Sequence, residues 1–197
     1  MKKKLAKFLI LSLLMCNITS CERDEIDDEN DIEEPNKNNV SSDLFSAKVD
    51  GKDFPKAVVE NTKVKFVKSM KTLQLLGQPE GHTETINVTL ANNVFNLDRV
   101  TAKDWKPGVY DDDADRISAG KYGIAAEYNK WNGSEYEAWF SNSSFEKGTQ
   151  IIIESNDGVN IKGTFKFKAF RRINGNYDRN NSKTITEGKF NVKIVEI

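Results

Sequence analysis

The feature that most constrains the fold of this chain is a strict alternation of apolar and polar residues between positions 159 and 169. The apolar set is Val159, Ile161, Gly163, Phe165, Phe167 and Ala169, and the polar set between them is Asn160, Lys162, Thr164, Lys166 and Lys168. Successive side chains of a β-strand point to opposite faces of the sheet. The alternation therefore predicts a strand with one buried and one solvated face, which is typical of antiparallel sheets.

Similar alternation recurs from residue 44 onward, and no segment shows a sustained helical stripe. We expect further strands at residues 45–49, 64–67, 73–76, 85–90, 109–110, 122–128, 151–153 and 190–194. Turn signals separate them, among them Asp50-Gly51 and Asn156-Asp157-Gly158. The chain is thus predicted to be all-β, an antiparallel β-sandwich or an open curled barrel of roughly eight to ten strands. Residues 92–103 are ambiguous and are compatible with one or two helical turns.

The N-terminus reads as a targeting signal, with a basic stretch at 1–7, an apolar stretch at 8–15, and Ile18-Thr19-Ser20 before Cys21. This quartet resembles the lipobox of bacterial lipoproteins, which implies cleavage after residue 20 and fatty acylation, including palmitate-type chains, of Cys21. The apolar run is too short to span a bilayer. We expect an N-terminal lipid anchor in the membrane. The alternative is an ordinary secretory signal with an incidental cysteine.

Residues 21–40 carry nine carboxylates and two basic residues, Arg23 and Lys37. Such a segment cannot bury enough apolar surface to fold, so we expect an acidic disordered tether before a single β domain at 41–197. The acidic run also resembles the surface-export signal of Bacteroidetes-type lipoproteins, which implies a domain outside the outer membrane. The alternative is a solvated spacer that keeps the domain in the periplasm.

The charge balance argues against a nucleic-acid partner. Removing the four lysines of residues 1–20 changes the formal charge from −1 to −5, and removing the −7 of residues 21–40 leaves the domain near +2. No concentrated basic surface is expected from that balance. The two cysteines are Cys16, inside the signal, and Cys21, so no disulfide is expected in the mature chain.

Several strand-turn elements together resemble the DUF6252-type lipoproteins of Bacteroidetes. They are Phe45-Ser-Ala-Lys-Val-Asp-Gly-Lys, Pro107-Gly-Val-Tyr, Gly163-Thr-Phe-Lys-Phe and Ile185-Thr-Glu-Gly-Lys-Phe-Asn-Val, in this order. The resemblance covers most of the domain and implies an all-β lipoprotein. It implies no activity, because that family has no established one and offers no catalytic residues.

Candidates for catalysis or metal binding are sparse. His82 is the single histidine and lies in a turn-like stretch, so neither a zinc site nor another cofactor is expected. The loop of Asp111, Asp112, Asp113 and Asp115 could offer oxygen ligands to calcium but lacks the EF-hand spacing, and a solvated loop is the alternative. A carboxylate pair for glycoside hydrolysis would draw on Glu127, Glu135 or Glu137, which have aromatic neighbours.

The most suggestive set is aromatic. Tyr128, Trp131, Tyr136, Trp139 and Phe140 are interleaved with amide and hydroxyl residues, and Trp105 is a further candidate. Ring faces that stack on sugars or peptides beside polar hydrogen-bonding groups are typical of recognition surfaces. The alternative is a hairpin whose rings complete the core.

These patterns favour a non-enzymatic, outer-membrane-anchored domain that binds a glycan, peptide or protein partner. An envelope-structural or protective lipoprotein of the immunity type is the alternative, and a small glycoside hydrolase a further one.

Overall fold

The computed structural model describes residues 44–58, 60–92, 100–112 and 122–197. Within these residues the chain forms one sheet of 11 strands. The strands are β1 (Phe45–Val49), β2 (Lys52–Asp53), β3 (Lys63–Val67), β4 (Thr72–Gly77), β5 (Glu84–Ala91), β6 (Gly108–Asp111), β7 (Gly123–Trp131), β8 (Tyr136–Ser141), β9 (Gln150–Asn156), β10 (Asn160–Ile173) and β11 (Asn176–Glu196). In the described part of the chain the helical elements are single 3-10 turns, η1 (Lys68–Met70), η2 (Glu80–His82) and η4 (Ala102–Asp104).

The sheet curls until seven strands close into a ring. The ring runs β11-β3-β4-β5-β7-β8-β10 and is closed by the pairing of β10 with β11. All of its pairings are antiparallel except β11 with β3, which is parallel. β1 and β2 branch from β11, and β9 and β6 branch from β10. The sheet is therefore a curled ring with two side branches.

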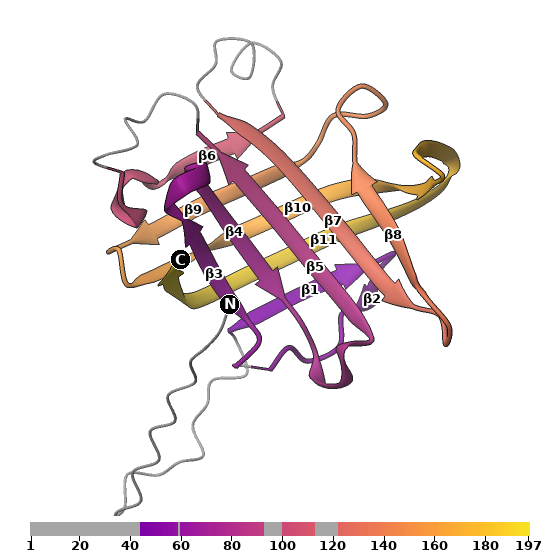
Figure 1. Ribbon diagram of the computed structural model, residues 1–197, viewed down its shortest axis with the longest axis horizontal. Coiled ribbons are helices and arrows are strands. Elements are labelled where there is room, and N and C mark those ends of the chain that lie inside the picture. Colours follow the sequence, from indigo (N-terminus) through magenta and orange to yellow (C-terminus); the bar gives the residue numbers. More distant parts are fainter. Residues whose placement is uncertain (1–43, 59, 93–99, 113–121) are drawn as a thin grey trace, which may run out of the picture. The chain divides into compact units, whose positions relative to one another are not determined.

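The closed sheet has two sides, which we call layers. The five-stranded layer is β3-β4-β5-β7-β8, and the six-stranded layer is β2-β1-β11-β10-β9-β6. Figure 1 shows β4, β5 and β7 crossing steeply in front of the long strands β10 and β11. The pairings of β10 with β8 and of β11 with β3 connect the two layers, so the arrangement is one continuous curled sheet.

The core fills the space between the layers. Phe66, Leu75, Ile86 and Tyr128 enter it from the five-stranded layer, and Phe190 enters from the other, each at most 2% exposed. The layers approach closely at Gly77 of β4, where an added Cβ would lie 2.2 Å from the ring of Phe45. Gly77 therefore makes room for the ring that joins β1 to the core.

Tight turns join the strands where the sequence supplies residues that tolerate positive φ. Asp50 (φ 50°) and Gly51 (φ 78°) join β1 to β2, and Asn174 (φ 50°) and Gly175 (φ 83°) join β10 to β11. Two successive positive φ angles define the turn whose twist matches paired strands. The predicted Asp50-Gly51 turn is confirmed.

The fold class predicted from alternation is confirmed, and most of the predicted inward residues of β10 are buried. The exception is Val159, which is 60% exposed. This residue was predicted to point inward, but it lies before β10 in a turn where its N–H donates to Asp157 Oδ1 at 2.7 Å. The turn hydrogen bond holds Val159 away from the core.

Two further differences concern strand lengths. β11 begins at Asn176, well before the predicted strand at 190–194, because its polar first half pairs with the end of β10. Of the ambiguous residues 92–103, positions 93–99 lie outside the described residues, and 102–104 form η4. The predicted signal peptide, Cys21 and the tether also lie outside the described residues.

Candidate functional site

The six aromatic residues proposed from the sequence divide into an exposed pair, the half-buried Phe140 and a buried set. Trp131 and Tyr136 are 42% and 49% exposed. Tyr128, Trp139 and Trp105 are at most 3% exposed and belong to the core. The pair thus offers the most ring surface that a ligand could reach, and the three buried rings match the alternative interpretation, in which rings complete the core.

The exposed pair is built by the β7–β8 hairpin. Trp131 and Tyr136 lie directly opposite each other in its register, with ring centroids 5.2 Å apart and ring planes inclined by 60°. The Tyr136 hydroxyl donates to the carbonyl oxygen of His82 in the neighbouring η2 turn. In the hairpin loop, Asn132 Oδ1 accepts hydrogen bonds from the backbone N–H groups of Ser134 and Glu135, both at 3.0 Å. These hydrogen bonds fix the hairpin loop and the position of the two rings.

Polar groups continue from the pair across the outer side of the five-stranded layer. Asn129 lies two residues before Trp131 on the same face and donates from its amide to Thr85 Oγ1 at 3.2 Å. Asn87 and Glu127 follow as a directly opposed pair. The Oδ1 atom of Asn87 is buried without a hydrogen-bond partner among the described residues. We call this surface the aromatic–amide face; its members are Thr85, Asn87, Glu127, Asn129, Trp131 and Tyr136.

The buried rings support this hairpin from inside. The Tyr128 hydroxyl donates to Glu84 Oε2 at 2.9 Å, and burial together with the Glu84 carboxylate raises the pKa of Tyr128. Trp139 donates from Nε1 to Asn181 Oδ1 at 2.9 Å. The guanidinium of Arg171 lies 5.2 Å from the centroid of the Trp139 ring. The inner side of the hairpin is therefore a structural support.

The glutamates considered for hydrolysis do not form a pair across a cleft. Glu127 lies opposite Phe140 in the β7–β8 register, and Glu137 is three residues from Phe140, so the two carboxylates point to opposite faces of the sheet. Glu137 instead pairs with Arg171 at 2.6 Å. The hydrogen bond from Arg171 outweighs desolvation and lowers the pKa of Glu137. Glu135 is exposed in the hairpin loop.

The remaining candidates from the sequence are placed as follows. His82 is exposed in η2, in agreement with the predicted turn. Asp112 is buried, and its carboxylate accepts hydrogen bonds from the backbone N–H groups of Gly148 and Thr149 at 3.0 and 3.1 Å. Asp113 and Asp115 lie outside the described residues. In the described ranges no group of three or more His, Cys, Asp or Glu residues could hold a metal ion.

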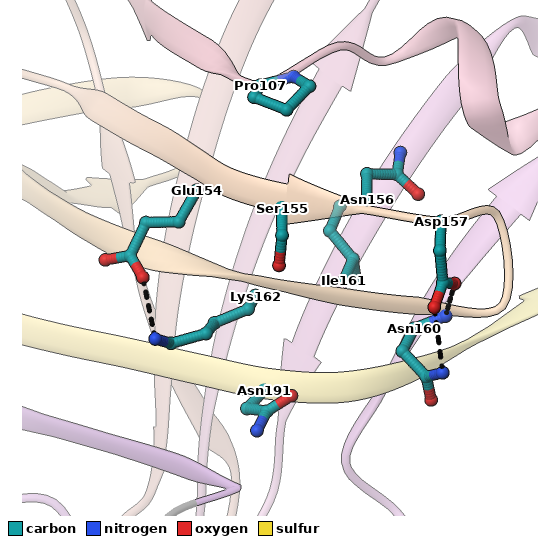
Figure 2. Close-up of a pocket in the computed structure, with 9 residues that line it drawn as sticks. All are labelled: Pro107, Glu154, Ser155, Asn156, Asp157, Asn160, Ile161, Lys162 and Asn191. Carbon is teal, nitrogen blue, oxygen red and sulfur yellow. Dashed lines mark hydrogen bonds and ion pairs between the residues drawn. The ribbon is translucent and has the colours of Figure 1, made fainter.

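The outer side of the six-stranded layer is hollowed. A hollow of about 320 Å³ lies between the ends of β9 and β10. In Figure 2 Pro107 lies above it and Asn191 below it. Lys162 and Glu154 form an ion pair at 3.1 Å across one end. At the other end, Asp157 accepts the N–H of Asn160 at 2.7 Å.

Two further hollows follow along β10. One of about 540 Å³ shares Glu154, Lys162 and Asn191 with the first, and Thr164 and Lys189 also line it. The next, of about 260 Å³, is lined in part by Lys147, Lys166 and Lys168. We call the surface of these two hollows the lysine groove.

The lysine groove was not predicted from the sequence. The outward lysines of residues 159–169 were interpreted as one solvated strand face. A signal was present, because Lys189 repeats the same outward pattern on the last strand. The groove depends, however, on β9, β10, β11 and β1 lying side by side, and strand order could not be inferred from alternation.

Comparisons with protein-family models, with curated proteins and with solved structures found no match. Among the described residues, no helix is both long and apolar enough to cross a membrane. Functional inference therefore depends on the surfaces of the domain and on its N-terminal sequence.

Proposed function

We propose that this chain is a lipid-anchored bacterial envelope protein whose β domain binds a glycan, without catalysing a reaction, at the aromatic–amide face. The observation that carries the proposal is the pair of adjacent, outward rings of Trp131 and Tyr136, with centroids 5.2 Å apart. Large apolar rings are usually buried, so two exposed neighbours on a rigid hairpin indicate a contact surface.

The neighbouring groups suit a sugar. The apolar face of a pyranose stacks on an aromatic ring, while its hydroxyls exchange hydrogen bonds with amides, hydroxyls and carboxylates. Asn129, Thr85 and Glu127 supply these groups within the same face. A peptide added as an extra strand would need a long free edge, whereas the terminal strands β2 and β6 have two and four residues.

The pKa values and positions of the carboxylates support a binding role over catalysis. A general acid for glycoside hydrolysis needs a raised pKa. Among the described residues, the carboxylates of Asp50, Glu137 and Asp157 each have a pKa below the ordinary value. Glu127 and Glu137 also point to opposite faces.

The anchoring part of the proposal rests on the sequence. The basic and apolar stretches before Cys21 support lipidation at that residue, and the acidic run behind it supports a place on the cell surface, with a periplasm-facing domain as the alternative.

The binding proposal is tested by Trp131→Ala on an array of neutral and acidic glycans. Loss of the stacked ring removes an aromatic anchor, so retention of the bound glycan should fall about tenfold or more. Val159→Ala is the matched control, because Val159 is also an exposed apolar residue but lies in the β9–β10 turn. Unchanged retention by Trp131→Ala, or an equal loss in the control, would refute the site.

The anchor is tested by Cys21→Ser. The variant lacks the thiol that accepts lipid, so it should leave the membrane fraction and appear in the soluble fraction. Persistent membrane association would refute lipidation at Cys21. Protease shaving of intact cells separates surface exposure from a periplasmic location.

A further inference from the structure

The lysine groove carries an excess of positive charge. Five lysines (Lys147, Lys162, Lys166, Lys168 and Lys189) line its two hollows, against the two glutamates Glu146 and Glu154. Both glutamates are already paired, Glu154 with Lys162 at 3.1 Å and Glu146 with Lys168 at 2.6 Å. Within the described ranges, Lys147, Lys166 and Lys189 have no carboxylate at ion-pair distance. Three ammonium groups are thus available to an anion.

Neutral hydrogen-bonding side chains alternate with these charges. Thr164 lies between Lys162 and Lys166 on β10 and directly opposite Lys189 on β11. Ser46 of β1 lies on the other side of Lys189, so that Thr164, Lys189 and Ser46 form a row across three strands. Asn191 continues the polar surface opposite Lys162. The groove therefore offers donors and acceptors beside Lys166 and Lys189.

The shape of the groove favours an elongated ligand. Its hollows follow β10 from Lys162 to Lys168, a length of about 20 Å at the rise of an extended strand. A concave strip of this length suits a linear polymer better than a flat membrane. Lys147 and Lys166 also line a neighbouring hollow with Asp111 and Asp112, and the buried Asp112 carboxylate accepts backbone hydrogen bonds from Gly148 and Thr149.

From charge, hydrogen-bonding groups and shape together, we infer that the lysine groove binds an acidic polysaccharide, a linear glycan that carries carboxylate or sulfate groups. The ammonium groups pair with its anions, and the threonine, serine and asparagine side chains hydrogen-bond with its hydroxyls. An acidic peptide would also pair with the ammonium groups, but it offers few hydroxyls to the threonine, serine and asparagine side chains of the groove. This second site is on the opposite layer from the aromatic–amide face and does not depend on it.

The test is affinity electrophoresis of the full chain through gels that contain polygalacturonate, dextran sulfate or neutral dextran. Polygalacturonate presents carboxylates and dextran sulfate presents sulfates, so the two gels separate the sources of the anion. The inference requires retardation by at least one acidic polymer and none by dextran. Lys166→Gln/Lys189→Gln should weaken that binding about tenfold, because each exposed charge contact contributes a few-fold in affinity.

Lys63→Gln/Lys65→Gln is the matched control, since it removes the same charge from β3 on the other layer. Its binding should equal that of the unmodified chain. An equal loss in this control, no retardation by either acidic polymer, or equal retardation by polyglutamate or duplex DNA would overturn the inference. Trp131→Ala is measured in parallel, so that failure of the aromatic–amide face is distinguished from failure of the lysine groove.

Discussion

The two outer surfaces of this domain are built on the same alternating strand pattern but carry different chemistry. The aromatic–amide face of β5, β7 and β8 presents two rings, amides and hydroxyls. The lysine groove of β10 and β11 presents ammonium groups and hydroxyls in hollows of about 540 and 260 Å³. The inner sides of both layers are apolar and form one core. The buried half of each strand therefore determines the fold, and the outer half is free to carry different surface chemistry on each layer.

The largest expected effect is a difference in stability between variants on the inner and outer sides of the β7–β8 hairpin. Trp139→Ala should lower the free energy of unfolding by about 3–5 kcal/mol, because it empties a buried site in the core. Trp131→Ala should lower it by less than about 1 kcal/mol, since that ring is already 42% exposed. Urea denaturation followed by circular dichroism measures both. Similar losses of stability for the two variants would mean that Trp131 is a structural residue. The distinction between a supporting inner side and a ligand-binding outer side would then be wrong.

The second prediction compares glycines in the two layers. An added Cβ at Gly163 of β10 would lie 2.0 Å from the carbonyl oxygen of Ile152, so Gly163→Ala should cost about 3 kcal/mol of stability. At Gly123 of β7 an added Cβ meets nothing within 4 Å, so Gly123→Ala should be neutral or slightly stabilising. Thermal denaturation measures the difference. If Gly163→Ala leaves the melting temperature unchanged, the close approach of β9 to β10 at Gly163 is not needed to form the lysine groove.

A smaller effect, an increase in stability, is expected on the aromatic–amide face. Asn87→Val should raise the free energy of unfolding by about 1 kcal/mol, because it removes a buried acceptor that has no partner in the described part of the chain. Thr89→Val, two residues along the same face of β5, is the control and should change stability less. A loss of stability in Asn87→Val would show that the amide is needed for packing.

The smallest expected effect is a pH dependence at the end of the six-stranded layer. The N–H groups of Asn160 and Val159 hydrogen-bond the Asp157 carboxylate at 2.7 Å and lower its pKa. A carboxylate whose folded-state pKa is depressed stabilises the fold above its unfolded pKa of about 3.9, and this contribution is lost as the pH falls through the folded pKa. Asp157→Asn should therefore melt below the unmodified chain at pH 7 and close to it at pH 2. A constant difference across this range would contradict the assignment.

Alternation predicted the fold class, and it predicted the inward residues of β10 from Ile161 to Ala169 because every second side chain of a strand shares an environment. It could not identify which aromatic residues of the hairpin are buried. Tyr136 and Trp139 lie on opposite faces of β8, and both faces carry rings. The face of β8 that is buried is set by its packing against β10 and β11. These strands are distant in sequence, so the burial cannot be read from the local pattern.

The lysine groove was missed for the same reason. Lys166 and Lys189 are far apart in the chain, and only the pairing of β10 with β11 brings them onto one surface. The polar first half of β11 was also missed, although Asn174-Gly175 before it is a strong hairpin signal. Its polar composition conceals a strand that is stabilised by backbone pairing.

The position of β11 has a consequence for how the domain is assembled. Phe45 pairs with Phe190, and Ile194 pairs with Val64, so one late strand completes the neighbours of both β1 and β3. Contacts between such distant segments form slowly, because a long loop must close first. A nascent or threading chain that has not yet released residues 185–196 keeps unpaired edges on β1, β3 and β10, so we expect the native domain to form only after that final segment becomes available.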